Sequence, residues 1–447
     1  MVQHVCERCG KTFDKKQGLT QHMKRKTPCE NIMEKVEEKI NKEVQKRVEI
    51  IQNPPTTTKK TSYKFIDLFC GIGGFHIALT QLGCECVLAC DIDQSCRDTY
   101  ADNYGITPVK DVRDIDPHNM MDFDIICAGF PCQPFSNGGK KRTFDDDRGL
   151  LFDEIMRIAK VKKPKFMFLE NVKHILKVSD GEVIEYIKKK INDAGYHLHL
   201  FNMSPHNYGI PQQRERVYFV CVRKDIVGEK QEIEIPEHIG TIKLENFMQK
   251  KEEIDEKYFV KGDILYTLNA WDEMVKKMEV GEKISPTILI HDAYRNHSAT
   301  DIASFADWRR DYIEKNEDLI KKYKPQFDEW YKKHKDVLQK REIYGKLEWQ
   351  VGTLKPNDSI FNHFIQVRQS GIRVKKAHYF PTLVAISQIP IYGKEKRYIT
   401  PRECARLQCF PESFKLNPND RHSYKQFGNS VNVKNVKTVA ETAFKFY

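Results

Sequence analysis

Cys132 stands between two prolines, in the part of the sequence best suited to present a nucleophile. The apolar run at residues 123–128 predicts a buried strand, and residues 129–136, Gly-Phe-Pro-Cys-Gln-Pro-Phe-Ser, follow its carboxyl end. Pro131 and Pro134 restrict the backbone on both sides, so we expect a stiff loop that presents the thiol. A cysteine thiolate is a soft nucleophile even when only a small fraction of it is ionised. Taken alone, Cys132 could equally be a structural thiol.

An acid and two arginines are expected near the same loop. Glu170 ends one apolar run, and Arg214 and Arg216 come where another begins. A lone acid or arginine at such a position is usually a surface charge or half of an ion pair. Here a nucleophile, an acid and an arginine fall on the same edge of one predicted sheet. That convergence is what an enzyme site requires.

A glycine-rich turn provides a candidate cofactor site. Residues 65–75, Phe-Ile-Asp-Leu-Phe-Cys-Gly-Ile-Gly-Gly-Phe, predict a strand that runs into a turn and then a helix. Gly71, Gly73 and Gly74 let backbone amides approach a ligand where a Cβ would collide. Asp91 ends the next apolar run and is placed to bind ribose hydroxyls, as nucleotide-type cofactors need. Asp111, after the following connection, could accept from an adenine amino group. The spacing departs from GxGxxG, which counts against NAD.

Alternating strands and helices must position these residues. Short apolar runs alternate with helical patterns, which predicts a doubly wound, Rossmann-like α/β sheet that binds ligands at the carboxyl ends of its strands. The alternation stops near residue 224, and residues 304–342 predict a helical insertion. The predicted strands are residues 64–69, 86–90, 123–128, 165–169, 197–203 and 216–222.

Composition narrows the class of protein. The 447 residues carry a net charge of +11, which favours a polyanionic partner. The 13 cysteines are an odd number scattered through apolar segments, which indicates a reducing compartment instead of a disulfide framework. No apolar run reaches the about 18 residues that cross a membrane, and the N-terminus lacks the apolar core of a signal peptide. We expect a soluble intracellular monomer that has no membrane partner.

The first 30 residues carry a separate pattern of metal ligands. Two cysteines, a histidine and a third cysteine follow the spacing Cys-x2-Cys-x12-His-x6-Cys, with Phe13 and Leu19 placed as the small core of a ββα zinc finger. The last gap exceeds the usual three to five residues, and its ligand is cysteine instead of histidine. Such a finger could contact DNA or another protein. The predicted ligands of Zn²⁺ are Cys6, Cys9, His22 and Cys29.

These motifs, in this order, resemble the cytosine-C5 DNA methyltransferase family of the restriction-modification type. The resemblance covers residues 64–223 and 398–447, and the N-terminal finger is not part of the family's pattern. The motifs are the turn at 69–73, Pro-Cys-Gln at 131–133, Arg-Gly-Leu-Leu-Phe at 148–152, Glu-Asn-Val at 170–172, Gln-Arg-Glu-Arg at 213–216, Thr-Pro-Arg-Glu-Cys-Ala-Arg-Leu-Gln at 400–408 and Gln-Phe-Gly-Asn-Ser-Val at 426–431.

The resemblance implies a role for each site residue. Cys132 would add to C6 of a cytosine, Glu170 would hold and protonate N3, and Arg216, with Arg214 beside it, would orient the base. Because a stacked base hides C6, the cytosine would be flipped out of the duplex, and residues 138–148 would close behind it. Ile92 replaces an aromatic residue common in the family. The implied S-adenosylmethionine pocket is Phe69, Gly71, Ile72, Gly73, Gly74, Asp91, Ile92, Asp111, Leu151, Asn429 and Ser430.

The resemblance also implies a partner and a division into domains. Double-stranded DNA would bind a long recognition region in which residues 366–376 are basic, although a plain basic surface turn remains open. Thr382 and Leu383 resemble a pair found in that region of the family. A cognate restriction endonuclease is a further expected partner, without a stable complex. A tRNA methyltransferase of the same fold and an inert zinc-finger regulator are the alternatives. The expected parts are a finger (1–30), a helical segment and linker (31–62), a catalytic domain (63–223), a target-recognition domain (224–397) and a returning segment (398–447).

Overall fold

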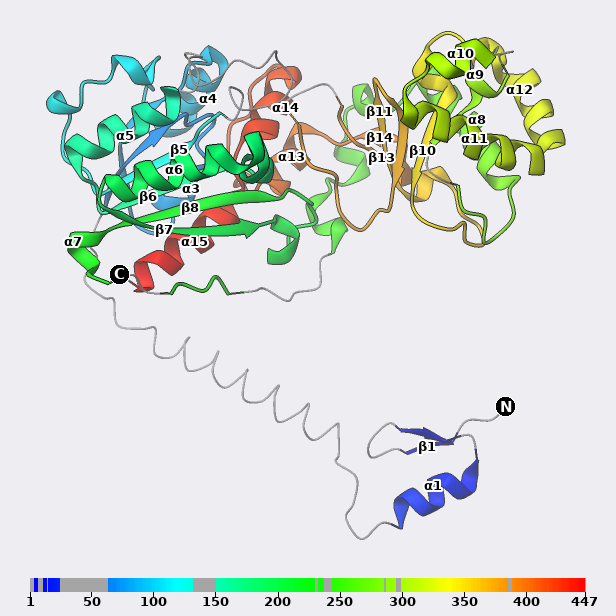
Figure 1. Cartoon of the computed structure of the whole chain (residues 1–447), viewed down its shortest axis with the longest axis horizontal. Coiled ribbons are helices and arrows are strands. Elements are labelled where there is room, and N and C mark those ends of the chain that lie inside the picture. The colour runs from blue at the N-terminus through cyan, green and yellow to red at the C-terminus, as the bar shows by residue number, and fades with distance from the viewer. Residues whose placement is uncertain are drawn as a thin grey trace. The chain divides into compact units, whose positions relative to one another are not determined.

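The computed structural model describes residues 4–6, 11–13, 15–24, 63–131, 150–229, 232–236, 243–284, 287–294, 299–384 and 388–446. The chain divides into two compact units, Met1–Thr61 and Ser62–Tyr447. The larger unit contains two six-stranded sheets, each with its own helices (Figure 1). No helix among the described residues is long and apolar enough to cross a membrane.

The first sheet carries all six predicted strands and confirms the α/β class. The four strands on one side of this sheet are parallel, and β8 runs antiparallel to both of its neighbours, so the sheet is mixed. The chain reverses its direction of travel across the sheet between β3 and β5, where open α/β sheets bind their ligands. The strand order is β4 (Glu85–Cys90), β3 (Lys64–Leu68), β5 (Ile125–Gly129), β6 (Phe166–Val172), β8 (Arg216–Arg223) and β7 (Tyr196–Met203).

Helices cover both faces of this sheet because its central strands are apolar on both sides. On one face, α3 (Gly74–Thr80) packs in one apolar cluster with α15 (Val433–Phe446), which comes from the C-terminus. On the other face lie α5 (Leu150–Lys162) and α6 (Glu182–Asp193). The sheet and its helices form what we call the large lobe, residues 63–229 and 399–446. It also contains α4 (Gln94–Tyr104), α7 (Lys224–Val227), α13 (Pro401–Leu407) and α14 (Asp420–Asn429).

The second sheet and its helices form what we call the small lobe, residues 259–398. One side of the sheet buries Trp271, Trp330 and Trp349 against the helices. The predicted helical insertion is confirmed by α11 (Asp307–Lys322) and α12 (Lys324–Leu338). The strand order is β14 (Arg397–Tyr398), β13 (Ile391–Tyr392), β11 (Phe364–Arg368), β12 (Gly371–Lys375), β10 (Lys346–Gln350) and β9 (Thr287–Leu289), and the other helices are α8 (Gly262–Lys276), α9 (Ile290–Ala293) and α10 (Ala299–Ser304).

The N-terminal unit has the predicted ββα order. Strands β1 (His4–Val5) and β2 (Thr12–Phe13) pair antiparallel and precede α1 (Lys16–Met23). Cys6 and His22 are buried, and the rings of Phe13 and His22 lie 5.1 Å apart. The other two predicted zinc ligands, Cys9 and Cys29, lie outside the described residues, as does the predicted helical segment and linker. The described part of the chain contains no group of three or more possible metal ligands.

Candidate active site

The predicted cofactor turn lies where β3 ends, and it is held by Asp91 at the end of β4. The amide of Gly71 donates to Asp91 Oδ2 over 2.8 Å, and the amide of Asp93 donates to Oδ1 over 2.8 Å. Gly71 has a φ of +53°, and a Cβ placed on it would meet nothing within 4 Å. The turn therefore borders open space, with the predicted ribose ligand Asp91 on its edge. Burial raises the pKa of the Asp91 carboxyl.

The next two glycines are required by close packing. A Cβ on Gly73, whose φ is +85°, would lie 2.4 Å from the ring of Tyr104. A Cβ on Gly74 would lie 2.6 Å from Val431 Cγ2 and 3.1 Å from Ser430 Oγ. The C-terminal segment, distant in sequence, is therefore pressed against the glycine turn. Ser430 is buried there, and its neighbour Asn429 is exposed.

The other predicted cofactor residues differ in exposure and in backbone conformation. Ile92 is 63% exposed beside Asp91, and Leu151 is half-buried on α5. Phe69 adopts a positive φ of 52°, whereas the side chain of Ile72 is fully buried in the apolar core, so only its backbone remains near the turn. Asp111 follows a bridge to β4 and forms an ion pair of 2.6 Å with Arg113, which lowers the pKa of the Asp111 carboxyl.

Glu170 and Arg216 meet at the end of the sheet. Glu170 pairs with Gly129 of β5 on one side and with Tyr218 of β8 on the other. Arg216 Nε lies 3.0 Å from Glu170 Oε1, and the two side chains are 14% and 10% exposed. Burial raises the pKa of the Glu170 carboxyl, and the positive charges of Arg216 and Arg214 oppose that rise. The pair can therefore offer both a proton and a cationic donor at this edge.

The same strand fixes the backbone that leads to Cys132. Asn171 Nδ2 donates over 3.0 Å to the carbonyl of Phe130, two residues before the cysteine. A Cβ on Gly129 would lie 3.9 Å from Glu170 Oε2. Cys132 itself, together with the predicted closing loop, lies outside the described residues. Asn171 was not among the predicted site residues, although its place beside Glu170 in the Glu-Asn-Val motif was a usable signal.

Arg214 does not share the environment of Arg216. It is 2% exposed, and its guanidinium donates to three main-chain carbonyls, those of Leu383 at 2.8 Å, Gly428 at 3.0 Å and Ser430 at 2.9 Å. Burial and the nearby charge of Arg216 lower the pKa of Arg214 to about 9. We expected a catalytic role for Arg214, and that role stays a prediction. The contacts of its side chain join Leu383 of the small lobe to the C-terminal segment.

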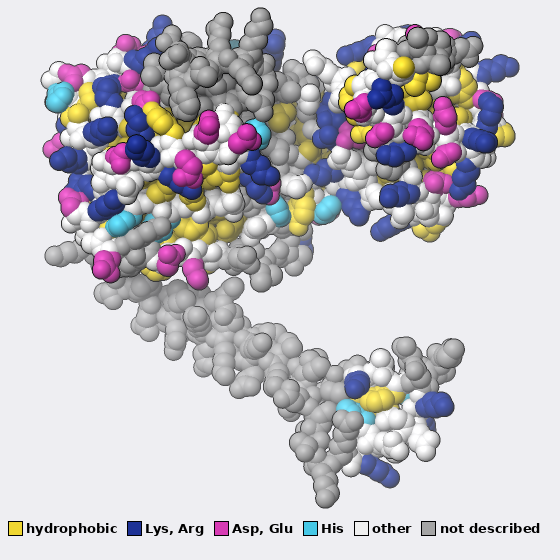
Figure 2. Space-filling view, viewed as in Figure 1, with side chains coloured by type: hydrophobic (Ala, Val, Ile, Leu, Met, Phe, Trp, Pro, Cys, Tyr) yellow, Lys and Arg dark blue, Asp and Glu magenta, His cyan; other side chains and the backbone are white. Residues whose placement is uncertain are grey.

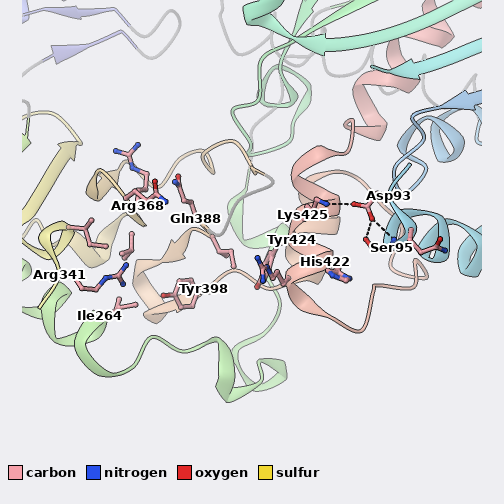
Figure 3. Close-up of a pocket in the computed structure, with 16 residues that line it drawn as sticks. Asp93, Ser95, Ile264, Arg341, Arg368, Gln388, Tyr398, His422, Tyr424 and Lys425 are labelled. Atoms are coloured by element: carbon pink, nitrogen blue, oxygen red, sulfur yellow. Dashed lines mark hydrogen bonds and ion pairs between the residues drawn. The ribbon is translucent and has the colours of Figure 1, made fainter. Parts of the chain in front are cut away.

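A cavity of about 1360 Å³ lies between the two lobes (Figure 3). Arg341 and Arg368 line it from the small lobe, and Arg421 and Lys425 line it from α14 of the large lobe. Lys425 Nζ lies 2.6 Å from Asp93 Oδ2, whereas neither Arg341 nor Arg421 has a carboxylate partner among the described residues. Basic and acidic side chains are interspersed over the face in Figure 2, so net charge alone does not locate a partner. The lining of the cavity includes four cationic side chains and one carboxylate, that of Asp93.

Comparisons with known proteins agree with this arrangement. Residues 63–445 match the family described as C-5 cytosine-specific DNA methylase. The chain is 30% identical over 380 residues to the Type II methyltransferase M.HhaI of Haemophilus parahaemolyticus, covering 85% of this chain and 94% of that protein. It is 32% identical over 424 residues to the Type II methyltransferase M.HgiCI of Herpetosiphon aurantiacus, covering 86% and 98%.

The fold has a counterpart among solved structures. The Entamoeba histolytica methyltransferase EhMeth superimposes with a TM-score of 0.51 at 18% identity, covering 86% of this chain and 98% of that one. At this identity the likeness concerns the fold alone. The family match spans both lobes and includes the glycine turn, the Glu170–Arg216 pair and the C-terminal segment. The chain therefore belongs to the C-5 cytosine-specific DNA methylase family and is a DNA (cytosine-5-)-methyltransferase.

Proposed function

We propose that this enzyme methylates C5 of a flipped-out cytosine within a specific sequence of double-stranded DNA, through a covalent bond from Cys132 to C6. The observation that carries the proposal is the Glu170–Arg216 pair beside the strand end that leads to Cys132. Glu170 of β6 pairs with Gly129 of β5, three positions before the cysteine, and Arg216 reaches Glu170 from β8 on the other side of β6. We infer that the acid, the cation and the nucleophile act together at this edge of the sheet.

The chemistry follows from what each residue offers. The Cys132 thiolate adds to C6, and Glu170, whose pKa is raised by burial, gives a proton to N3 and so relieves the negative charge that develops on the ring. Arg216 donates to the base and keeps Glu170 oriented. C5 then has enamine character. Once it is methylated, loss of the C5 proton, return of the N3 proton to Glu170 and departure of the Cys132 thiolate restore the aromatic ring. Extrusion of the base from the duplex costs a few kcal/mol.

The glycine turn fits S-adenosylmethionine, which supplies an electrophilic methyl group on a sulfonium. Gly71 borders open space, so main-chain groups of the turn are accessible to a ligand. Asp91 is suited to ribose hydroxyls, Asp111 to an adenine amino group, and the exposed side chain of Ile92 to a face of adenine. Leu151 and Asn429 would complete the pocket. An aliphatic side chain at Ile92 stacks less strongly on adenine than an aromatic ring does.

We assign the cavity between the lobes to the DNA duplex, with the small lobe as the target-recognition domain. Arg341 and Arg421 face it from opposite lobes without carboxylate partners among the described residues, as phosphate-binding arginines would. The relatives' Type II names support a role in modifying DNA, with protection against a restriction endonuclease as the biological purpose. A tRNA substrate is the competing assignment, because base flipping would serve either nucleic acid.

A direct assay tests this function. The full chain is incubated with methyl-labelled S-adenosylmethionine and either unmethylated duplex DNA or tRNA, and 5-methylcytosine is then mapped at base resolution. We expect label on DNA at one short recurrent sequence, and none from Cys132→Ser or from Glu170→Gln. Label on tRNA alone would move the substrate to RNA. A folded protein that binds S-adenosylmethionine but labels neither would refute the catalytic proposal.

We also propose that the N-terminal unit binds one zinc ion through Cys6, Cys9, His22 and Cys29. The ββα order supports this, as does the burial of Cys6 and His22 on neighbouring elements. Because small fingers fold only with their metal, chelation should unfold this unit and leave the remainder folded. Metal analysis of the purified chain tests the assignment. One zinc per chain, lost in Cys6→Ser with His22→Ala, is expected, and metal-free protein purified without a chelator would refute it.

A further inference from the structure

The sheet of the small lobe has two chemically different faces. Ile365, Ile372, Val374 and Leu347 pack against the helices in one apolar cluster. Since side chains alternate along a strand, their sequence neighbours point to the opposite face. That opposite face carries polar residues on three adjacent strands: Gln366 and Arg368 on β11, Arg373 and Lys375 on β12, and Glu348 and Gln350 on β10.

The polar face is turned toward the large lobe. Phe364, which shares this face, packs in the apolar cluster of the large lobe, and so does Tyr392 opposite it. Lys375 Nζ lies 2.6 Å from the side-chain oxygen of Gln213, three residues before Arg216. Arg368 also lines the cavity between the lobes, where it is drawn beside Gln388 (Figure 3). Arg368 therefore places one end of the polar face at the cavity assigned to DNA, and Lys375 links the face to Gln213, close to Arg216.

One carboxylate organises the two arginines of this face. Glu348 of β10 is in register with Arg373 of β12, which is in register with Gln366 of β11. Glu348 Oε1 lies 3.0 Å from Arg373 Nε, and Glu348 Oε2 pairs with Arg368 Nη2. Arg368 stands opposite Gly371, where a Cβ would lie 2.7 Å from Lys346 Cβ. The side chains of Arg373 and Arg368 remain 29% and 15% exposed.

This arrangement suits bases better than phosphates. A carboxylate shared between two guanidiniums lowers their attraction for the DNA backbone and fixes the direction of each fork. Arg341 and Arg421, which line the cavity, have no carboxylate partner among the described residues. Arg373 uses Nε for Glu348, and its two terminal nitrogens have no partner in the described part of the chain. Two parallel N–H donors match O6 and N7 of guanine in the major groove, which is the commonest specific arginine contact.

We propose that Arg373, oriented by Glu348 and flanked by Arg368, reads a guanine next to the target cytosine. The inference rests on the proposed function and adds the residues that determine its specificity. Arg373 binds the base, and Glu348 acts as a positioning residue that limits how many orientations the fork adopts. The recognition sequence then contains at least one fixed G·C pair besides the target pair.

The test is methylation of a pool of random-sequence duplexes by the full chain, with sites mapped at base resolution. We expect Arg373→Gln to reduce the preference for guanine at one position by about 10- to 100-fold, while other positions of the motif persist. Arg373→Lys retains the charge and an ion pair with Glu348 but lacks the fork, so it should relax the same position. Glu348→Gln should relax it less. Arg223→Gln, which removes an ion-paired arginine at the far end of β8, should leave the motif intact.

Each result is decisive when cofactor binding and thermal unfolding are measured on the same proteins. An unchanged motif in folded Arg373→Gln and Arg373→Lys would overturn the inference and reduce the cluster to a structural ion pair. A uniform loss of rate at all sequences would also overturn it, because that result indicates a phosphate contact. Wild-type protein that methylates no duplex DNA would refute the proposed function itself, and the inference with it.

Discussion

Arg216 and Glu170 reach each other across adjacent strands, with Arg216 Nε 3.0 Å from Glu170 Oε1. Burial of the carboxyl and the charge of the guanidinium act in opposite directions on the pKa of Glu170, and burial is the stronger of the two. The balance matters because a carboxyl that keeps its proton can donate it to the cytosine ring. Removing the arginine should therefore change the pH dependence of the reaction and not only its rate.

We expect Arg216→Gln to move the alkaline limb of the single-turnover rate to higher pH. Without the arginine the pKa of Glu170 rises further, so the acid form persists to higher pH. The rate at the optimum should fall about 10- to 100-fold, because the base loses a charged donor. Rates measured from pH 6 to 10 test both effects. Arg223→Gln, on the same strand but at its other end, should show neither. A limb at the wild-type position would mean that Glu170 does not supply the proton.

Gly74→Ala should loosen the C-terminal segment from the cofactor turn. The new Cβ would lie 2.6 Å from Val431 Cγ2 and 2.9 Å from the Val431 carbonyl oxygen, so that segment must shift. We expect a loss of about 1–3 kcal/mol in unfolding free energy and weaker binding of S-adenosylmethionine by calorimetry. Adding Val431→Ala should restore part of the loss. Gly129→Ala is the control, because its Cβ would make only ordinary contacts at 3.7 Å and beyond. Equal losses in both variants would contradict this explanation.

The sequence predicted the parts of the site that depend on local pattern. Apolar runs located the strands, and the residues at their ends, Asp91, Glu170 and Arg216, do lie along one edge of the sheet. Contacts between segments that are distant in the sequence could not be predicted from local pattern. Arg214 resembles Arg216 in sequence, yet its guanidinium donates to the carbonyls of Leu383, Gly428 and Ser430, a set defined only by the folded chain.

The small lobe shows the same limit more clearly. Residues 366–376 were basic in sequence and were expected to contact a groove or phosphates. Their orientation depends on β10, because Glu348 there pairs with Arg368 and Arg373. No local spacing relates Glu348 to these arginines, since the pairing requires β12 to lie between β10 and β11.

Asp67→Asn should make the protein less sensitive to alkaline pH. Asp67 is fully buried under the glycine turn, and burial, followed by the charge of Asp91, raises the pKa of its carboxyl well above the usual value. A raised folded-state pKa gives stability that is complete below the unfolded pKa near 3.8 and is lost as pH rises through the folded pKa. The loss reaches at most about 1.4 kcal/mol per pH unit. Denaturant unfolding from pH 5 to 9 should show a shallower decline for the variant, whereas parallel curves would mean that Asp67 keeps an ordinary pKa.

Glu403→Gln should destabilise the protein where the chain passes between the two lobes, which we call the crossing. The loss in unfolding free energy should be far larger than that from removing a surface ion pair. Glu403 and Arg397 are both fully buried, and four donors point at the carboxylate: Nη1 and Nη2 of Arg397 at 2.8 Å each, and the amides of Gln249 and Thr400 at 2.9 Å each. Gln249 lies where the chain approaches the small lobe, and Arg397 lies where it leaves. The amide of the glutamine would point its own NH₂ group at some of these donors. It would also leave the buried guanidinium of Arg397 with less compensating negative charge.

The expected cost of Glu403→Gln is about 3–5 kcal/mol in unfolding free energy. Glu412→Gln is the matched control, because Glu412 also pairs with an arginine, Arg406, but its side chain is 62% exposed. That change should cost no more than about 1 kcal/mol. Urea denaturation of both variants at neutral pH compares them directly. If the two losses were the same, the buried pair would contribute no more than a solvated one, and the crossing would be held by its apolar packing alone.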